Sequence, residues 1–145
     1  MKNIIFAFLV PFFAFSQNNK LDQKYGFEKY VFGTSPKEYS NLVLEIDEGA
    51  VQLYSYGQSF TRFENVTFED VYITFNKDKL STISFKTKNA TGSKMLQNLK
   101  QIYGEPKKSL INKGDYEWLG VKVKLLYEPI STTDALITFY CRNIK

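Results

Sequence analysis

Histidine is absent from this sequence, and its absence excludes most of the chemistry that small enzymes use. Ser-His-Asp and Cys-His catalysis and histidine proton transfer need the imidazole, and zinc sites of the usual type need histidine or several cysteines. A Gly-rich phosphate-binding loop is also missing. We therefore expect a protein that is not an enzyme, with no catalytic residues, no metal and no cofactor.

A pair of carboxylates, as in glycoside cleavage, is the enzymatic option that remains. The candidates lie at turns and predicted strand edges, where carboxylates are ordinarily solvated: Glu45, Asp47, Glu48, Glu64, Glu69 and Asp70. Their spacing does not fix two carboxyl groups across a cleft, and the first three lack the pattern of a calcium-binding EF-hand loop. A small enzyme that acts on envelope polymers is therefore the weakest alternative.

Cysteine is nearly absent as well, since Cys141 is the only one. A single cysteine excludes an intramolecular disulfide. Cys141 alternates with Ile137 and Phe139, which predicts a shielded thiol that packs as a small apolar side chain. The alternative is a free reactive thiol or one that forms an intermolecular bond.

Only one long apolar run is present, and it lies at the start of the chain. Lys2 precedes the run, Ala14-Phe15-Ser16 follows it, and the run is too short to span a bilayer as a helix. This layout predicts a signal peptide over residues 1–16 and a mature chain that begins at Gln17. No cysteine follows the cleavage site, so no lipid anchor is expected. The mature protein is expected to be soluble, without a membrane span, and periplasmic or secreted.

The mature chain is long enough for one domain with a core. Residues 17–25 are polar and predict a flexible lead, and residues 26–145 form the single domain. Residues 17–70 hold 5 basic and 9 acidic residues, whereas residues 71–145 hold 13 basic and 6 acidic ones. This separation of charge indicates either solvated faces of opposite sign or a site for an anionic partner.

Two helices are predicted. Ser35 can cap the first, Pro36 suits its first position, and Glu38 completes a capping box. Apolar residues then follow at helical spacing, at Tyr39, Leu42, Val43 and Ile46. Alternatively, Val43-Leu44 opens a strand. The second helix spans Ser93 to Tyr103 and ends at Gly104.

Alternating residues predict strands over residues 51–56, 65–75, 80–88, 115–119, 121–127 and 135–142. In the hairpin over 65–88, a five-residue loop places Ile73 opposite Ile83 and Val71 opposite Phe85. In the hairpin over 115–127, a tight turn sets four pairs: Trp118 with Val121, Glu117 with Lys122, Tyr116 with Val123, and Asp115 with Lys124. A three-residue loop would shift this second register by one. The fold class that follows is α+β, an antiparallel sheet with two helices packed on one face, in a tandem helix-plus-hairpin repeat.

The uncovered face of this sheet is the main candidate for binding. The residues expected there are aromatic or cationic and suit a protein or an anionic polymer: Tyr72, Lys86, Lys88, Tyr140 and Arg142. A second candidate is the aromatic segment over residues 54–63, with Tyr56 and Arg62. The plain alternatives are a wet sheet face with scattered tyrosines and a hairpin with half-buried aromatic side chains.

Several short motifs carry a family resemblance, and together they cover most of the mature chain. They are Phe15-Ser16 before Gln17, Phe32 to Glu38, Phe75 to Ile83, Tyr103-Gly104-Glu105-Pro106, and Tyr116-Glu117-Trp118. In these the sequence resembles small exported proteins of Bacteroidota. More distantly, the helix-then-hairpin units are similar to the outer-membrane-assembly lipoprotein BamE, although its lipobox cysteine is missing, and to the repeats of the β-lactamase-inhibitor protein.

The resemblance implies a periplasmic or secreted binding domain. Its partner would be another envelope or secreted protein or an anionic polymer, and not nucleic acid. The alternative is a secreted inhibitor or immunity-type protein. The sequence leaves the oligomeric state open.

Overall fold

Most of the chain forms β-sheet. The computed structural model describes residues 16–56, 63, 66–109, 112 and 114–143, with side chains from Lys20 onward. The helices are α1 (Ser16–Lys24) and α2 (Gly92–Tyr103), and Pro36–Glu38 forms a single 3₁₀ turn. The strands are β1 (Gly26–Phe27), β2 (Tyr30–Val31), β3 (Leu42–Asp47), β4 (Val51–Tyr56), β5 (Phe68–Asn76), β6 (Lys79–Thr87), β7 (Lys107–Lys108), β8 (Tyr116–Leu119), β9 (Val123–Pro129) and β10 (Ala135–Cys141).

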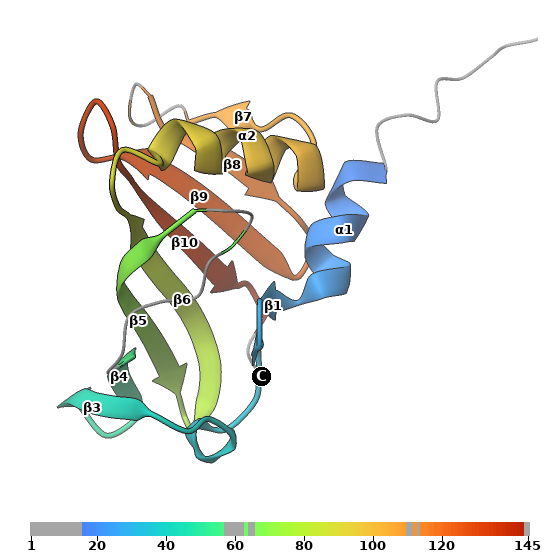
Figure 1. Cartoon of the computed structure of the whole chain (residues 1–145). Helices are drawn as coiled ribbons and strands as arrows, with labels where there is room; N and C mark the ends of the chain where they lie inside the picture. Colours follow the sequence, from blue (N-terminus) through green and yellow to red (C-terminus); the bar gives the residue numbers. More distant parts are fainter. Residues whose placement is uncertain (1–15, 57–62, 64–65, 110–111, 113, 144–145) are drawn as a thin grey trace, which may run out of the picture.

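Eight of these strands form one antiparallel sheet, in the order β3-β4-β5-β6-β10-β9-β8-β7 (Figure 1). The last strand of the chain, β10, lies in the middle, between β6 and β9. The remaining two strands, β1 and β2, make a small separate hairpin. The predicted antiparallel sheet is confirmed.

The predicted α+β class is wrong, because the structure is mostly β. The first predicted helix starts as expected: Ser35 caps Lys37 N–H and forms the capping box with Glu38. It ends after that one turn, and β3 begins at Leu42. The strand alternative at Val43-Leu44 is therefore the correct one, since branched apolar residues fit the extended sheet better than a helix. Without this helix there is no tandem helix-plus-hairpin repeat.

The second predicted helix is confirmed as α2. Its apolar stripe buries Met95, Leu99 and Tyr103, and Gly104 ends the helix at a φ of +83°. The left-handed backbone at Gly104 needs a residue without a Cβ atom.

The segment expected to be a flexible lead forms helix α1. Leu21 from this helix is fully buried in the core, and the Asp22 carboxylate accepts backbone hydrogen bonds from the β8–β9 turn. One apolar and one acidic residue in a polar segment therefore hold α1 against the sheet.

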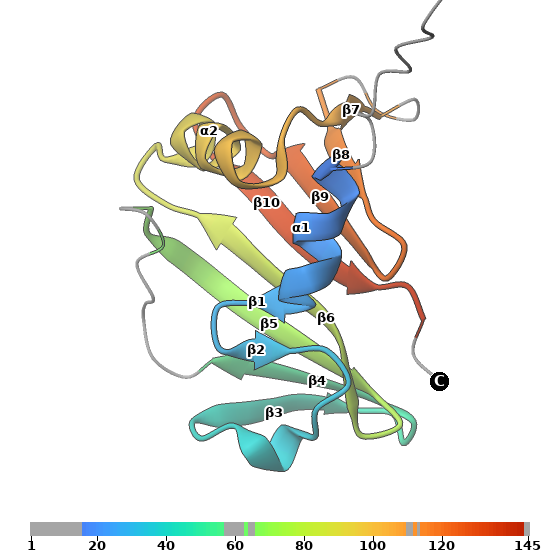
Figure 2. The same ribbon diagram turned by 90° about the vertical axis from the view of Figure 1, so that its right-hand side faces the viewer.

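One face of the sheet is covered by α1, α2 and the β1–β2 hairpin (Figure 2). Phe27 from β1 lies at the centre of the core beneath this layer. Its ring centroid is 4.8 Å from that of Phe85, 5.0 Å from that of Phe139 and 6.0 Å from that of Phe68. The helices add Leu21, Met95, Leu99 and Tyr103 to the same cluster. The opposite face of the sheet has no such cover among the described elements, and we call it the open face.

The β5–β6 hairpin keeps the predicted pairing of Ile73 with Ile83, but its turn differs. Lys77 and Asp78 form a two-residue turn, both with positive φ, in place of the expected five-residue loop. The register shifts between Thr74 and Phe75, which compensates for the shorter turn. Val71 lies in a second irregularity, between Glu69 and Tyr72, so its predicted pairing with Phe85 is wrong.

The predicted register of the β8–β9 hairpin is also wrong. Trp118 pairs with Leu125, Glu117 with Leu126, and Tyr116 with Tyr127. The turn is closed by the Gly120 N–H, which donates to the Val123 carbonyl at 2.8 Å. The shift covers an even number of residues, so it leaves the facing of each side chain unchanged. Trp118 is therefore buried, as expected, although Val121 is exposed in the turn.

Candidate functional site

The open face is built by alternation along the central strands. Residues that alternate with the buried Ile83 and Phe139 point away from the core, and the strand register aligns them in rows. One row contains Tyr72, Ser84, Thr138 and Leu126, and the next contains Thr74, Thr82, Tyr140 and Lys124. The structure thus places Tyr72 and Tyr140 on one surface, as the sequence predicts.

Small hydroxyl side chains form the floor between these tyrosines. The hydroxyls of Ser84 and Thr138 lie 3.2 Å apart, and Thr138 is buried although it lies on the open face. Tyr140 is half-buried and Tyr72 is exposed. The centre of the open face is therefore a neutral, low surface with an aromatic side chain on either side.

The two predicted lysines of the open face share one carboxylate. Lys86 Nζ lies 3.2 Å from Glu69 Oε1, and Lys88 Nζ lies 3.1 Å from Glu69 Oε2. Hydrogen bonds from Lys88 and then Lys86 hold the pKa of Glu69 below its ordinary value. Lys86 and Lys88 are brought together as expected, but half of their charge is already neutralised.

Further along the sheet the charges are paired as well. Lys124 Nζ lies 3.4 Å from Glu117 Oε2. Burial, together with the nearby Asp115, raises the pKa of Glu128, and Lys124 opposes this shift. The open face is therefore close to neutral and does not present a continuous cationic surface.

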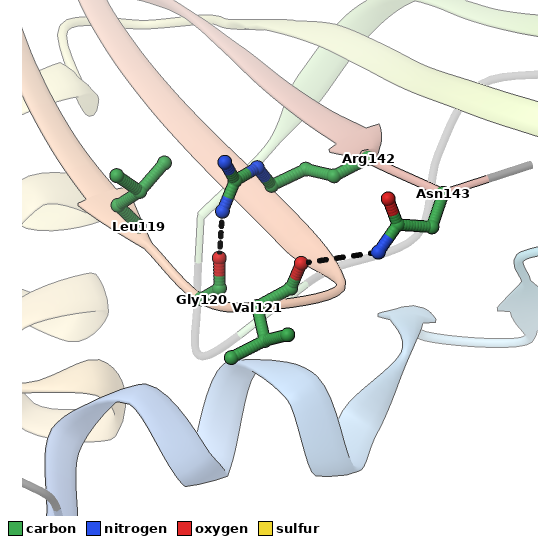
Figure 3. A pocket seen from close by; sticks show the side chains of 5 residues that line it. All are labelled: Leu119, Gly120, Val121, Arg142 and Asn143. Atoms are coloured by element: carbon green, nitrogen blue, oxygen red, sulfur yellow. Dashed lines mark hydrogen bonds between the residues drawn. The ribbon is translucent and has the colours of Figure 1, made fainter.

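Arg142 serves a structural role at the end of β10. Its guanidinium Nη1 donates to the Gly120 carbonyl, and its backbone N–H donates to the Lys122 carbonyl at 2.8 Å. Figure 3 shows the Arg142–Gly120 contact, and the hydrogen bond from Asn143 Nδ2 to the Val121 carbonyl, around a shallow hollow lined by Leu119, Gly120, Val121, Arg142 and Asn143. The Arg142 side chain is hydrogen-bonded to the β8–β9 turn, so the structure does not group it with Tyr72 and Tyr140.

Tyr56 from the second predicted candidate lies on the covered side of the sheet. It shares its facing with Tyr54, whose ring packs 5.3 Å from the ring of Phe75. The Lys29 ammonium lies 4.7 Å from the centroid of the Tyr56 ring and 5.3 Å from that of Tyr30. This cation–π contact fixes the β1–β2 hairpin against β4. Arg62 lies outside the described residues.

The candidate carboxylates form no group of three or more within the described part of the chain. Glu69 is held by its two lysines, and the described residues contain no cluster of three or more metal-ligating side chains. Glu64 lies outside the described residues.

Sequence reasoning missed an exposed apolar edge, because it placed β3 in a helix. Val43, Leu44 and Ile46 are 49%, 47% and 50% exposed. Val43 and Ile46 were expected on the buried side of that helix, whereas in the structure they lie on the open side of an edge strand. Four branched apolar residues within Leu42–Asp47, beside two acidic ones, were the available signal for a strand.

Comparison with known proteins gives no match: no family model, no curated protein and no solved structure is similar to this chain. Among the helices that the structure describes, neither has the length and apolar character needed to cross a bilayer.

Proposed function

We propose that this protein is an exported, non-enzymatic binding module of the cell envelope, and that its open face contacts another protein. The supporting observation is the placement of Tyr72 and Tyr140 on either side of a small hydroxyl floor. Tyrosines on a rigid sheet supply large contact area at low entropic cost, and aromatic side chains are enriched in protein interfaces.

The charge on the open face favours a protein partner over an anionic polymer. A polyanion binds through many unpaired cations, each of which releases a counterion. Lys86 and Lys88 instead share Glu69, and Lys124 is paired with Glu117. A protein surface with its own polar groups suits such a nearly neutral face better.

The exported location rests on the N-terminal sequence alone, which has the layout of a signal peptide over residues 1–16. An exported chain of one domain, with a covered core on one side of its sheet and an open face on the other, suits interaction in the periplasm or outside the cell.

Site-specific photo-crosslinking in the producing organism tests this proposal. A photoreactive phenylalanine analogue replaces Tyr72 or Tyr140 on the open face, and Gln97, exposed on α2, serves as the matched control. We expect a discrete adduct from both tyrosine positions and none from Gln97. Equal labelling at all three positions, or no adduct at Tyr72 and Tyr140, would contradict a binding role for this face.

A further inference from the structure

The two edges of the large sheet differ in a way that bears on binding. The β7 edge is only Lys107–Lys108, a short and charged strand, which is a usual way to block further pairing. The β3 edge is the six-residue strand Leu42–Asp47, and β4 is its single neighbour among the described strands. The backbone groups on its outer side are therefore available to another strand.

Apolar side chains accompany this backbone on both faces of the sheet. Val43 lies opposite Ser55 and Ile46 lies opposite Leu53 on the open side, whereas Leu44 lies opposite Tyr54 on the covered side. Val43, Leu44 and Ile46 are each about half exposed. An added strand would cover them and pair with the backbone at the same time, which combines the two contributions that β-strand addition uses.

Acidic side chains line the same edge and its turn. Glu45, Asp47 and Glu48 are all exposed. Glu45 and Asp47 accept hydrogen bonds from neutral groups: the Ser55 hydroxyl donates to Glu45, and the Gly49 N–H donates to Asp47 Oδ1 at 2.9 Å. These carboxylates favour a partner strand that carries cations.

Two features disfavour a second copy of this chain at the same edge. Antiparallel pairing of two β3 strands would bring the carboxylates of both copies together, which is unfavourable. The register with β4 also shifts between Leu44 and Ile46, so Glu45 forms a bulge that bends the edge. A bend hinders the pairing of two rigid sheets but not the pairing of a flexible peptide.

We infer that β3 is a docking strand for an extended segment of a partner protein in which Lys or Arg alternates with branched apolar residues. The inference rests on the proposed function, because it names the chemistry of a partner for this binding module. It assigns the contact to the β3 edge, which is separate from the Tyr140 region of the open face.

Peptide titration of the mature protein tests this inference. The probe is a fluorescently labelled peptide of alternating lysine and valine, followed by anisotropy. One control peptide replaces lysine with glutamate, and the other carries N-methyl groups on the amides of one edge. We expect binding of the first peptide, no binding of the acidic one, and strong loss with N-methylation, since backbone hydrogen bonds carry much of the affinity.

Three protein variants locate the binding site. Ile46→Lys loses an apolar contact and adds a like charge, so we expect affinity to fall about tenfold. Ile130→Lys makes the same change in the β9–β10 turn at a side chain that is 48% exposed, against 50% for Ile46, and should leave affinity unchanged. Tyr140→Ala alters the open face and reports whether the peptide binds there instead of at β3.

Several results would overturn the inference. Absence of binding, equal binding of the N-methylated peptide, or equal loss in Ile46→Lys and Ile130→Lys would each do so. Loss in Tyr140→Ala alone would assign the peptide to the open face, which removes the edge proposal but keeps the proposed function. Sedimentation that shows a wild-type dimer, dissociated by Ile46→Lys, would identify a second copy as the occupant. Failure of crosslinking at Tyr72 and Tyr140 would count against the open face only.

Discussion

Asp22 is a single carboxylate that fastens α1 to the far end of the chain. Its Oδ2 accepts the Val121 N–H at 2.7 Å, and its Oδ1 accepts the N–H groups of Lys122 and Val123 at 2.8 and 3.0 Å. Val121 and Lys122 belong to the turn between β8 and β9, and Val123 is the first residue of β9. The Asp22→Ala variant therefore removes three charge-assisted hydrogen bonds at once.

The expected cost of Asp22→Ala follows from the surroundings of the three donors. A hydrogen bond to a charged group contributes about 1.5–3 kcal/mol where water cannot replace it. The Val121 and Lys122 N–H groups are exposed, so water can substitute there, whereas the Val123 N–H is partly buried. We therefore expect a loss of about 2–3 kcal/mol in the free energy of unfolding, close to the value for one such bond. Gln23→Ala, on the exposed side of α1, is the matched control and should cost about 0.5 kcal/mol or less.

Gly120 offers an independent check on this contact. A Cβ atom at Gly120 would lie 2.3 Å from Asp22 Oδ1 and 3.0 Å from the Val123 carbonyl oxygen. Gly120→Ala should therefore displace the carboxylate and destabilise the protein. Once Asp22 is replaced by alanine, the closest obstacle is gone, and Gly120→Ala should cost about 1–2 kcal/mol less than in the wild type.

Urea denaturation of the wild type, the two single variants and the double variant measures this coupling. If Gly120→Ala costs the same in both backgrounds, within about 0.5 kcal/mol, the two residues are independent and the contact is refuted. Asp22→Ala with the stability of Gln23→Ala would refute it as well, because α1 would then be held by other contacts.

Four further predictions concern single residues. Trp118→Ala should cost about 3–5 kcal/mol in thermal or urea unfolding, because the indole is 5% exposed and its N–H donates to a backbone carbonyl at 2.7 Å; an unchanged midpoint would refute this. Cys141 should react with a thiol reagent more slowly in the native than in the denatured protein, because it is half-buried and its Sγ lies 3.3 Å from the Tyr25 hydroxyl; equal rates would contradict shielding. Lys88 and Lys86 lower the pKa of Glu69, so the stabilisation that ionised Glu69 provides is complete above the ordinary glutamate pKa of about 4.3 and is lost as the pH falls through the lowered pKa. The free energy of unfolding of Glu69→Gln should lack this pH dependence between pH 5 and the acid transition. Mass spectrometry of protein from the producing organism should find an N-terminus at Gln17, and a retained apolar run would exclude cleavage there.

The elements that could be predicted are those whose own periodicity decides their structure. α2 has a helical apolar stripe and a glycine stop at Gly104, and β4 to β6 alternate clearly, so their type and facing follow from local pattern. The facing of Trp118 survives an incorrect register, because the error is an even number of residues. Burial of the core and the two tyrosines on one face were predictable for this reason.

The elements that could not be predicted are decided by contacts between distant parts of the chain. The capping box at Ser35 is real, but it closes only one turn, because β4 offers Leu42–Asp47 a partner strand. A local signal fixes where a helix begins and not how far it continues. The polar segment of α1 likewise becomes ordered through Asp22, whose donors lie 99 to 101 residues away. No spacing within residues 17–25 contains that information.

Because of the strand order, the unequal distribution of charge along the sequence becomes an unequal distribution of charge across the sheet. The acidic first part of the mature chain supplies β3 and β4 at one end of the sheet, and the basic second part supplies β7, β8 and β9 at the other. The ion pairs of Glu69 and Glu117 neutralise charge on the strands between the two edges. Charge of opposite sign therefore remains at opposite edges, with Glu45 and Asp47 on β3 and the two lysines on β7. A cationic segment is attracted toward the β3 edge before any contact forms, and this attraction weakens over about 8 Å at physiological salt. Association at β3 should then slow as salt rises, whereas the apolar contacts of Val43 and Ile46, once made, do not depend on it.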